Sequence, residues 1–189
     1  MKHYKALITV LIFVLIAACG ETEQEQAQQE QREQQLQMQM IQTTAEFDER
    51  MSAVLDHYFE LKDALVESDA DRAKTVAGQL KAESETVEQH GINEETMALW
   101  ITLKNVIAEN SNDITALNDV DEQRYHFEYI SDTMIEMVDQ FKPVGYELYH
   151  QSCPMVRGGT GEWLSREEQI RNPYHGERMM NCGETIRRI

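Results

Sequence analysis

The fold is decided by residues 44–67, which read TAEFDERMSAVLDHYFELKDALVE. Apolar side chains recur in this stretch at intervals of four and three residues. They are Phe47, Met51, Val54, Tyr58, Leu61 and Leu65. This spacing places them on one side of an α-helix, as in the helices of an antiparallel bundle. We therefore expect a first amphipathic helix that runs from Thr44 to about Glu67.

A second and a third helix follow from the same periodicity. The second is predicted to begin at the capping residues 68–71 and to end at His90-Gly91, because glycine readily adopts the left-handed conformation that follows a helix. The third is predicted to begin after Asn93 and to be interrupted by the polar run 109–113. Their inward residues are Ala73, Val76, Leu80 and Val87 in the second and Met97, Trp100, Leu103 and Ile107 in the third.

A fourth helix is predicted between Asn118-Asp119 and Pro143, because the residue before a proline disfavours helical geometry. Its inward residues are Val120, Phe127, Ile130, Met134, Val138 and Phe141. Four amphipathic helices joined by short connections form an up-and-down bundle. The sequence therefore predicts a mainly α chain in which residues 44–142 form an antiparallel four-helix bundle.

The composition changes after the bundle, and residues 143–189 are predicted to form an irregular, short-β appendage. We expect a short strand at 144–149, a turn-rich loop at 156–161, one or two helical turns opened by residues 165–168, and a short terminal strand or tail at 184–189. So small a sheet cannot bury enough surface to be stable alone. The appendage is therefore expected to pack on the bundle.

The N-terminus predicts a lipid-anchored envelope protein. Lys2 and Lys5 precede an apolar run that is too short to span a membrane, which is typical of a signal peptide. This run ends in Leu15-Ile16-Ala17-Ala18-Cys19, which resembles a bacterial lipobox. Residues 1–18 are thus predicted to be a lipoprotein signal peptide, cleaved before a lipidated Cys19, although an ordinary signal peptide is the alternative. Gly20 after the cysteine favours the outer membrane, with the protein facing the periplasm.

Residues 19–43 are predicted to form a tether between the lipid and the bundle. This segment is rich in Gln and Glu and has no apolar stripe wide enough to bury. Segments of this composition stay solvated, as a coil or a frayed helix. In either form the segment would hold the folded domain away from the membrane.

The charge of the chain excludes one class of partner. The chain has 17 Lys+Arg and 34 Asp+Glu, a net charge of −17. Nucleic-acid binding depends on cations that neutralise phosphates, so we expect no nucleic-acid partner. We also expect no enzymatic activity, because no nucleophile elbow, His-Glu-x-x-His motif or phosphate-binding loop is present.

Soft ligands gather in the appendage. The candidate metal ligands are Cys153, Met155, Met179 and Cys182, with His150, His175 and Met180 as additional candidates. Thiolate, thioether and imidazole groups select Cu(I) and, less strictly, Zn(II). Cys153 and Met155 are two residues apart on an extended backbone, which places both on one face of a strand. The alternative is that Cys153 and Cys182 form a structural disulfide and bind no cofactor.

A family resemblance rests on an ordered set of motifs. They are Tyr58 to Val66, Gln123-Arg124 with Phe127 and Ser131, Cys153-Pro154-Met155, Trp163-Leu164-Ser165, Ile170-Arg171-Asn172-Pro173-Tyr174, Gly176, Met179 and Cys182-Gly183. Together they resemble a bacterial family catalogued as domain of unknown function 3347, from about Val54 to the C-terminus. Members are envelope proteins, often lipoproteins, and similar domains are fused to membrane-fusion subunits of heavy-metal efflux pumps.

The resemblance implies a helical bundle and a role in copper or silver handling. It supports the sulfur ligands, with Met179 preferred over Met180, but neither imidazole, since members have an aromatic residue at the position of His175 and a variable residue at His150. Two functions follow as expectations. The first is a periplasm-facing lipoprotein that binds Cu(I), with zinc or silver as other ions, as an accessory of copper or heavy-metal homeostasis or efflux. The second is a structural, disulfide-stapled envelope domain that binds a protein partner through motif residues, namely Trp163, Asn172, Pro173, Tyr174 and Gly176.

Overall fold

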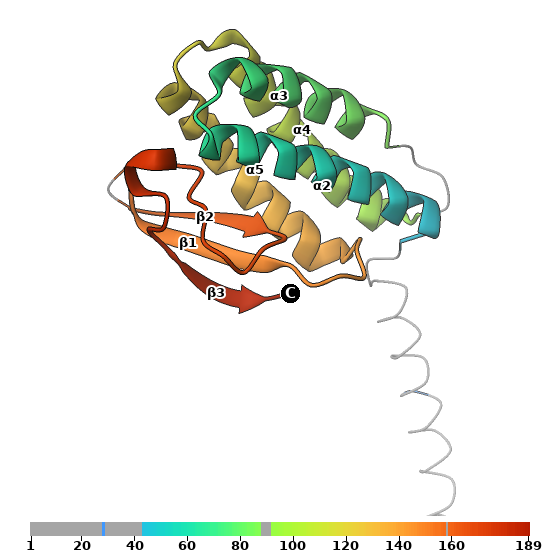
Figure 1. Cartoon of the computed structure of the whole chain (residues 1–189). Coiled ribbons are helices and arrows are strands. Elements are labelled where there is room, and N and C mark those ends of the chain that lie inside the picture. Colours follow the sequence, from blue (N-terminus) through green and yellow to red (C-terminus); the bar gives the residue numbers. More distant parts are fainter. Residues whose placement is uncertain (1–27, 29–42, 88–91, 158) are drawn as a thin grey trace, which may run out of the picture. The chain divides into compact units, whose positions relative to one another are not determined.

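The computed structural model describes Gln28 and residues 43–87, 92–157 and 159–189. This part of the chain consists of four α-helices, a short 3₁₀ helix and a three-stranded antiparallel sheet (Figure 1). The mainly α fold is therefore confirmed. The predicted signal peptide, Cys19 and nearly all of the predicted tether lie outside the described residues. In the described ranges, no helix combines the length and the apolar character that a membrane span requires.

The four helices begin at the polar residues that the sequence indicates. They are α2 (Ala45–Val66), α3 (Ala70–Glu85), α4 (Glu94–Ala116) and α5 (Val120–Phe141). The N-cap residues are Thr44, Asp69, Asn93 and Asp119, and the side chain of each accepts a hydrogen bond from a backbone amide in the first turn. Such caps satisfy amides that have no partner within the helix.

Two helix boundaries differ from the prediction. Helix α3 ends at Glu85, where the Thr86 hydroxyl donates to the Glu83 carbonyl over 2.8 Å, and the predicted end at His90-Gly91 lies outside the described residues. Helix α4 is not interrupted by residues 109–113. Ser111 and Ile114 are fully buried and extend the inward face that passes through Ile107, so the packed face continues through the polar run.

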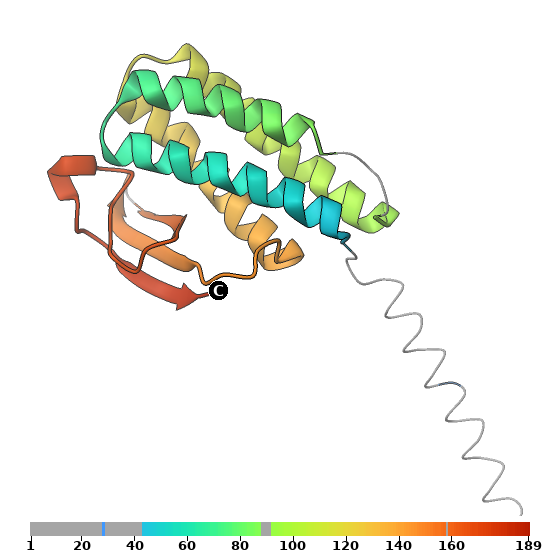
Figure 2. The same ribbon diagram turned by 45° about the vertical axis from the view of Figure 1, so that its right-hand side comes forward.

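Consecutive helices pack against one another, and α2 also contacts α5, which closes the bundle (Figures 1 and 2). The interior is built from the predicted apolar faces. Its largest fully buried side chains include Trp100, Tyr58, Phe127, Met51, Leu55, Leu61, Leu65 and Leu80. At roughly 1.5–3 kcal/mol per fully buried large apolar side chain, this burial is the main force that holds the helices together. Helix α5 ends with Lys142 in the left-handed conformation, before Pro143.

The appendage contains a sheet in the order β2-β1-β3. Strand β1 is Tyr149–Val156, β2 is Gly159–Ser165 and β3 is Glu184–Arg188. The predicted terminal strand is thus confirmed. The predicted strand at 144–149 is wrong, because residues 144–148 are irregular and the strand starts only at Tyr149. The predicted loop at 156–161 is shorter than expected, since β2 already begins at Gly159.

The helical turns predicted from Ser165 are also absent, and residues 166–169 form bends. The Ser165 hydroxyl accepts the amide of Glu167 over 3.0 Å, and the Gln151 side chain donates to the carbonyls of Glu167 and Glu168. Side chains therefore form hydrogen bonds with the backbone amide and carbonyl groups that would otherwise pair within a helix. Local side-chain hydrogen bonds of this kind compete with helix formation.

The sheet lies against α5 and α2, as Figures 1 and 2 show from two sides. The buried Tyr58 hydroxyl of α2 accepts the Leu164 amide of β2 over 3.0 Å and shares a hydrogen bond with the Ser131 hydroxyl of α5 over 2.7 Å. Arginines of the appendage pair with aspartates of the helices, namely Arg166 with Asp56, Arg171 with Asp63, Arg178 with Asp121 and Arg187 with Asp139. The appendage is therefore packed on the bundle, as expected.

Candidate metal centre

The two cysteines of the appendage meet although they are far apart in the sequence. Cys153 lies in β1, Cys182 lies just before β3, and their Sγ atoms are 3.0 Å apart. Both are free thiols. Cys153 has no exposed surface, whereas Cys182 is partly exposed. A reagent or an ion can therefore approach this pair from the Cys182 side.

The chain around Cys182 is held by Asn172. The Asn172 side chain donates to the Cys182 carbonyl over 2.9 Å, and its backbone amide donates to the Met180 carbonyl over 2.9 Å. Gly183 lets this segment approach β1, because its φ is +145° and an added Cβ would lie 2.5 Å from the Ser152 carbonyl oxygen. The roles of Asn172 and Gly183 are thus to bring Cys182 against the strand that holds Cys153.

Met155 does not share a face with Cys153, contrary to the prediction. Cys153 is fully buried and Met155 is 59% exposed. The β1–β2 register shifts between Cys153 and Val156, and Pro154 lies within this shift. Proline has no N–H to donate to a sheet and occurs at bulges, where the regular alternation of side chains is lost. The bulge turns the Met155 side chain toward solvent.

The segment that contains His175, Met179 and Cys182 nevertheless lies beside the segment that contains Cys153 and Met155. His175 donates from Nε2 to the Met155 carbonyl over 3.0 Å, and the Cys182 amide donates to the Met179 carbonyl over 3.0 Å. Met179 ends the 3₁₀ helix η1 (Gly176–Met179), and its hydrogen bond with the Cys182 amide closes a turn between the two residues. Met179 and Met180 are both partly buried. Cys153, Met155, His175, Met179 and Cys182 therefore belong to two adjoining segments.

His150 takes no part in this group. Its Nε2 donates to Glu162 over 2.6 Å, and its Nδ1 accepts from Arg187 over 3.2 Å. Arg187 in turn pairs with Asp139 of α5 over 2.5 Å. Both ring nitrogens are thus occupied within a polar chain between the sheet and α5, and His150 is a poor candidate ligand. The sequence could not reveal this chain, because its members come from four separate elements.

Cys153 influences the protonation of Cys182. The hydrogen bond with Cys153, and then burial, raises the pKa of the Cys182 thiol above its ordinary value. Thiols must lose their protons to bind a metal, and only the thiolate is nucleophilic. Alkylation of Cys182 at neutral pH is therefore slow, and metal binding must release protons.

The sulfur separation is compatible with a bound ion after a small movement. With metal–sulfur distances of about 2.3 Å, two thiolates lie about 3.8 Å apart at a tetrahedral angle and about 4.6 Å apart in a linear arrangement. A disulfide instead needs about 2.05 Å. From the observed 3.0 Å, the sulfurs must separate by about 0.8 Å or more for a metal, or approach by about 1 Å for a bond. Either change is small for a cysteine just before a strand.

No third conventional ligand joins the thiols in the described ranges, where no group of three or more His, Cys, Asp or Glu side chains could hold a metal ion. Structural zinc sites use four ligands. Two thiolates, by contrast, are a sufficient set for Cu(I), and methionine sulfur is the natural addition to it.

The motif residues that we predicted as a partner surface are buried. Trp163 has no exposed surface and donates from Nε1 to the Gln151 side chain over 2.8 Å. Tyr174 is 4% exposed and donates from its hydroxyl to the Glu162 carbonyl over 2.6 Å. Asn172, Pro173 and Gly176 are buried as well. These residues pack the appendage and do not form a docking surface, which the sequence motif alone could not distinguish.

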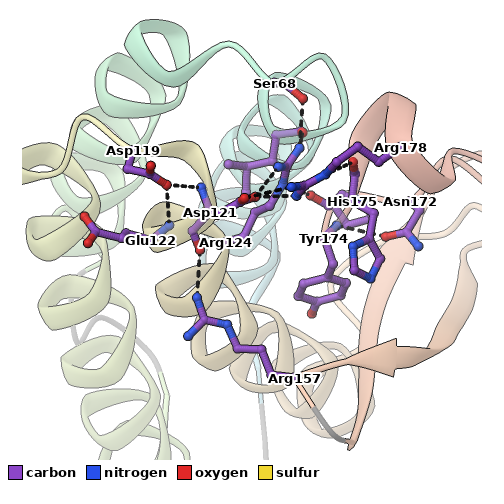
Figure 3. A network of polar contacts seen from close by, with 12 residues as sticks. Ser68, Asp119, Asp121, Glu122, Arg124, Arg157, Asn172, Tyr174, His175 and Arg178 are labelled. Carbon is purple, nitrogen blue, oxygen red and sulfur yellow. Dashed lines mark hydrogen bonds and ion pairs between the residues drawn. The ribbon is translucent and has the colours of Figure 1, made fainter.

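Arg124 of α5 joins these motif residues to the bundle, as Figure 3 shows. It donates to the Pro173 carbonyl, to the Leu65 carbonyl and Ser68 hydroxyl, and to the Asp121 carboxylate. Gly176 lies directly over it, because an added Cβ would be 2.7 Å from Arg124 Nη2. The Asn-Pro-Tyr-x-Gly motif is therefore the part of the appendage that fits onto Arg124.

These features define the class of protein: a four-helix domain on which a small sheet is docked, and whose docked segment holds two adjacent thiols. The family described as "Protein of unknown function (DUF3347)" matches residues 54–145, so this segment of the chain is similar to that family. The match covers most of the bundle and ends before the Cys-Pro-Met and Asn-Pro-Tyr motifs, whose resemblance stays a prediction. No curated protein and no solved structure matches the chain.

Proposed function

We propose that this chain is a lipid-anchored, periplasm-facing protein that binds Cu(I) through Cys153 and Cys182, as an accessory of copper or heavy-metal homeostasis or efflux. The observation that carries the proposal is the 3.0 Å separation of two free thiols that are 29 residues apart in sequence. Soft thiolate ligands select Cu(I) over hard cations. The protein binds and passes on an ion and catalyses no reaction.

The surroundings of the pair support this assignment. Cys153 is sealed from solvent while Cys182 is partly exposed, so an ion can enter from one side only. Met179 precedes Cys182 by one turn, and Met155 lies two residues beyond Cys153 with its side chain exposed. In this proposal Met179 completes the site, and Met155 receives an ion at the surface. Zinc and silver are the other ions that such ligands would accept.

The test is a Cu(I) titration of the reduced protein, without oxygen, against a chromophoric competitor. The protein should carry Cys19→Ser, so that only the two appendage cysteines are present. We expect one Cu(I) per chain, with no binding by Cys182→Ser and much weaker binding by Cys153→Ser. Undetectable binding by the reduced wild-type pair would overturn the proposal.

The thioethers are tested by replacing Met155 and Met179 with Leu together, a change that nearly conserves side-chain volume. We expect Cu(I) affinity to fall at least about tenfold, or about 1.4 kcal/mol. Met97→Leu in the core of α4 is the matched control and should leave the affinity unchanged. Full affinity in the double variant would restrict the site to the two thiols.

A second function, the disulfide-stapled envelope domain, is favoured by the same short sulfur separation. A bond between Cys153 and Cys182 would close a loop of about 30 residues, which the chain-entropy model values at roughly 3–4 kcal/mol. Its formation would pass two electrons and two protons to a periplasmic thiol oxidant. The burial of Trp163 and Tyr174 means that any partner of such a domain must bind elsewhere.

The two functions are separated by counting thiols in protein isolated from the cell envelope without reductant. Two reactive thiols, or a bound metal at about one per chain, support the metal-binding protein. No reactive thiol, with a thermal midpoint that falls on reduction, supports the stapled domain. The anchor is tested independently by Cys19→Ser in cells, which should release the protein from the membrane fraction. Retention of this variant on the membrane after a carbonate wash would refute the lipid tether.

A further inference from the structure

A second recessed site lies where α5 begins and the appendage meets it. A cavity of about 230 Å³ is lined there by Arg124, Arg157 and Arg178, together with Asp121 and His175. Figure 3 shows the arginines arriving from different elements, with Arg124 on α5, Arg157 after β1 and Arg178 on η1. None of these residues is a proposed metal ligand except His175, an additional candidate.

The cavity carries positive charge in a chain that is strongly acidic. Three guanidinium groups against the one lining carboxylate give 3 − 1 = +2, while the whole chain has a net charge of −17. The Asp121 carboxylate stays ionised, because its hydrogen bonds with Arg178 and Arg124 lower its pKa to about 2. The amides at the start of α5 are already capped by Asp119, so this charge comes from side chains.

Some of the arginine donors are unused. Arg157 donates from Nη2 to the Asp121 carbonyl over 2.8 Å and stacks 4.5 Å above the Tyr125 ring. An arginine has five N–H donors, so four of those on Arg157 have no acceptor among the residues that the structure describes. Arg124, by contrast, is buried and largely occupied. Arg157 therefore has donors available to a ligand in the cavity.

The arrangement around Asp121 shows which chemistry the arginines fit. Arg178 donates from Nη1 and Nη2 to the two carboxylate oxygens of Asp121, over 2.9 and 2.5 Å. Such two-pronged contacts are the preferred mode of carboxylate recognition by arginine. Val156 and Tyr174 are only 5% and 4% exposed, and these small exposed parts supply apolar wall behind the charged groups. The cavity thus combines a cationic rim with an apolar interior.

We propose that this cavity binds a small carboxylate that carries an apolar body. The free N–H groups of Arg157 and the outer ones of Arg178 hold the carboxylate beside Asp121, and the apolar body lies against Val156 and Tyr174. The same chemistry is offered by a free organic acid and by the C-terminal residue of a peptide. This site is independent of the cysteine pair, and its failure would leave the proposed metal binding untouched.

The test is a titration of the full chain carrying Cys19→Ser with benzoate, at constant ionic strength, followed by the NMR shifts of the backbone amides. We expect saturable shifts at residues 174–178 and no saturable shift with benzamide, which has the same ring without the charge. Arg157→Gln, at an exposed position, should weaken benzoate binding at least tenfold. Arg72→Gln, which removes an exposed arginine paired with Glu67 at the turn between α2 and α3, should leave it unchanged.

Equal binding of benzamide, full benzoate binding by Arg157→Gln, or shifts that never saturate would each overturn the proposal. Arg178→Gln is the second variant and should weaken binding in the same direction. N-acetyl-glycyl-phenylalanine, with a free or an amidated end, then identifies the source of the carboxylate. Tighter binding of the free peptide than of benzoate assigns the site to a chain end, and weaker binding assigns it to a free acid.

Discussion

Arg124 Nε donates to the backbone carbonyl of Pro173 over 2.8 Å, and this contact links the fourth helix of the bundle to the appendage. The same guanidinium donates to the Leu65 carbonyl over 2.7 Å and to the Ser68 hydroxyl over 2.9 Å. Arg124 is only 4% exposed, so these bonds replace water almost completely. One side chain thereby holds together the end of α2, the start of α5 and the segment that leads to Cys182.

Replacing Arg124 by Ala should therefore destabilise the protein strongly. The change removes one of the donors to the Leu65 carbonyl and leaves the buried Pro173 carbonyl without its Arg124 donor, which costs about 1–3 kcal/mol. The free energy of unfolding from urea titration measures the loss. Arg72→Ala is the control, because Arg72 and Glu67 are exposed and such pairs contribute about 0–1 kcal/mol. Similar losses in the two variants would contradict the role of Arg124.

Gly176→Ala should weaken the docking of the appendage. Gly176 has φ +54°, and an added Cβ would lie 2.7 Å from both Arg124 Nη2 and Ser68 Oγ and 2.9 Å from the Val66 carbonyl oxygen. Left-handed strain and overpacking together should cost about 2–4 kcal/mol in the unfolding free energy. Gly145→Ala is the matched control, since an added Cβ there meets nothing within 4 Å. An unfolding free energy equal to that of the wild type in Gly176→Ala would show that the contact between the appendage and Arg124 can relax.

Tyr58→Phe should cost about 1–3 kcal/mol, because it leaves the buried Leu164 amide without an acceptor. Burial also raises the pKa of Tyr58 well above its ordinary value, so the hydroxyl stays protonated beside the Ser131 hydroxyl. Tyr149→Phe removes an exposed hydroxyl bond to Glu147 and should change stability little. The hydrogen-exchange rate of the Leu164 backbone amide measures the local effect. This rate should increase in Tyr58→Phe and not in Tyr149→Phe.

The stability of the protein should fall in acid partly through Asp121. The pKa of its carboxyl is lowered from 3.8 to about 2, first by the hydrogen bond with Arg178. A lowered folded-state pKa adds stability above the unfolded-state pKa, and this stability is lost as the pH falls from about 4 to about 2. Unfolding free energies measured between pH 6 and pH 2 should fall less steeply in Arg178→Gln and in Asp121→Asn. An unchanged slope in both variants would exclude this contribution.

Most of the helical fold is readable from the sequence. The spacing of Phe47, Met51 and Val54 and the polar residues Asp69, Asn93 and Asp119 before the later helices depend on local chemistry, and they lie where the sequence predicted. The sequence did not predict the continuous helix through residues 109–113, because that prediction used local helix propensity alone. Asn and Ser are weak helix formers, but the burial of Ser111 and Ile114 against other helices outweighs local propensity.

The appendage was predicted less well, because its elements are held by partners that are distant in the sequence. The bends after Ser165 depend on Gln151, and the exposure of Met155 depends on a bulge at Pro154. The ring of His150 is occupied by Glu162 and Arg187, which lie in two other strands. None of these contacts leaves a periodic pattern in the sequence.

The sequence by itself determined the four helices, the change of composition after Pro143 and the pair of cysteines that had to meet. The tertiary structure alone decided that Met155 faces solvent, that Trp163 and Tyr174 are buried, and that three arginines surround one cavity. The physical reason is the range of the interactions. Helix periodicity and capping act within a few residues, whereas the sheet and its junction with the bundle rest on side chains brought together only when the chain folds.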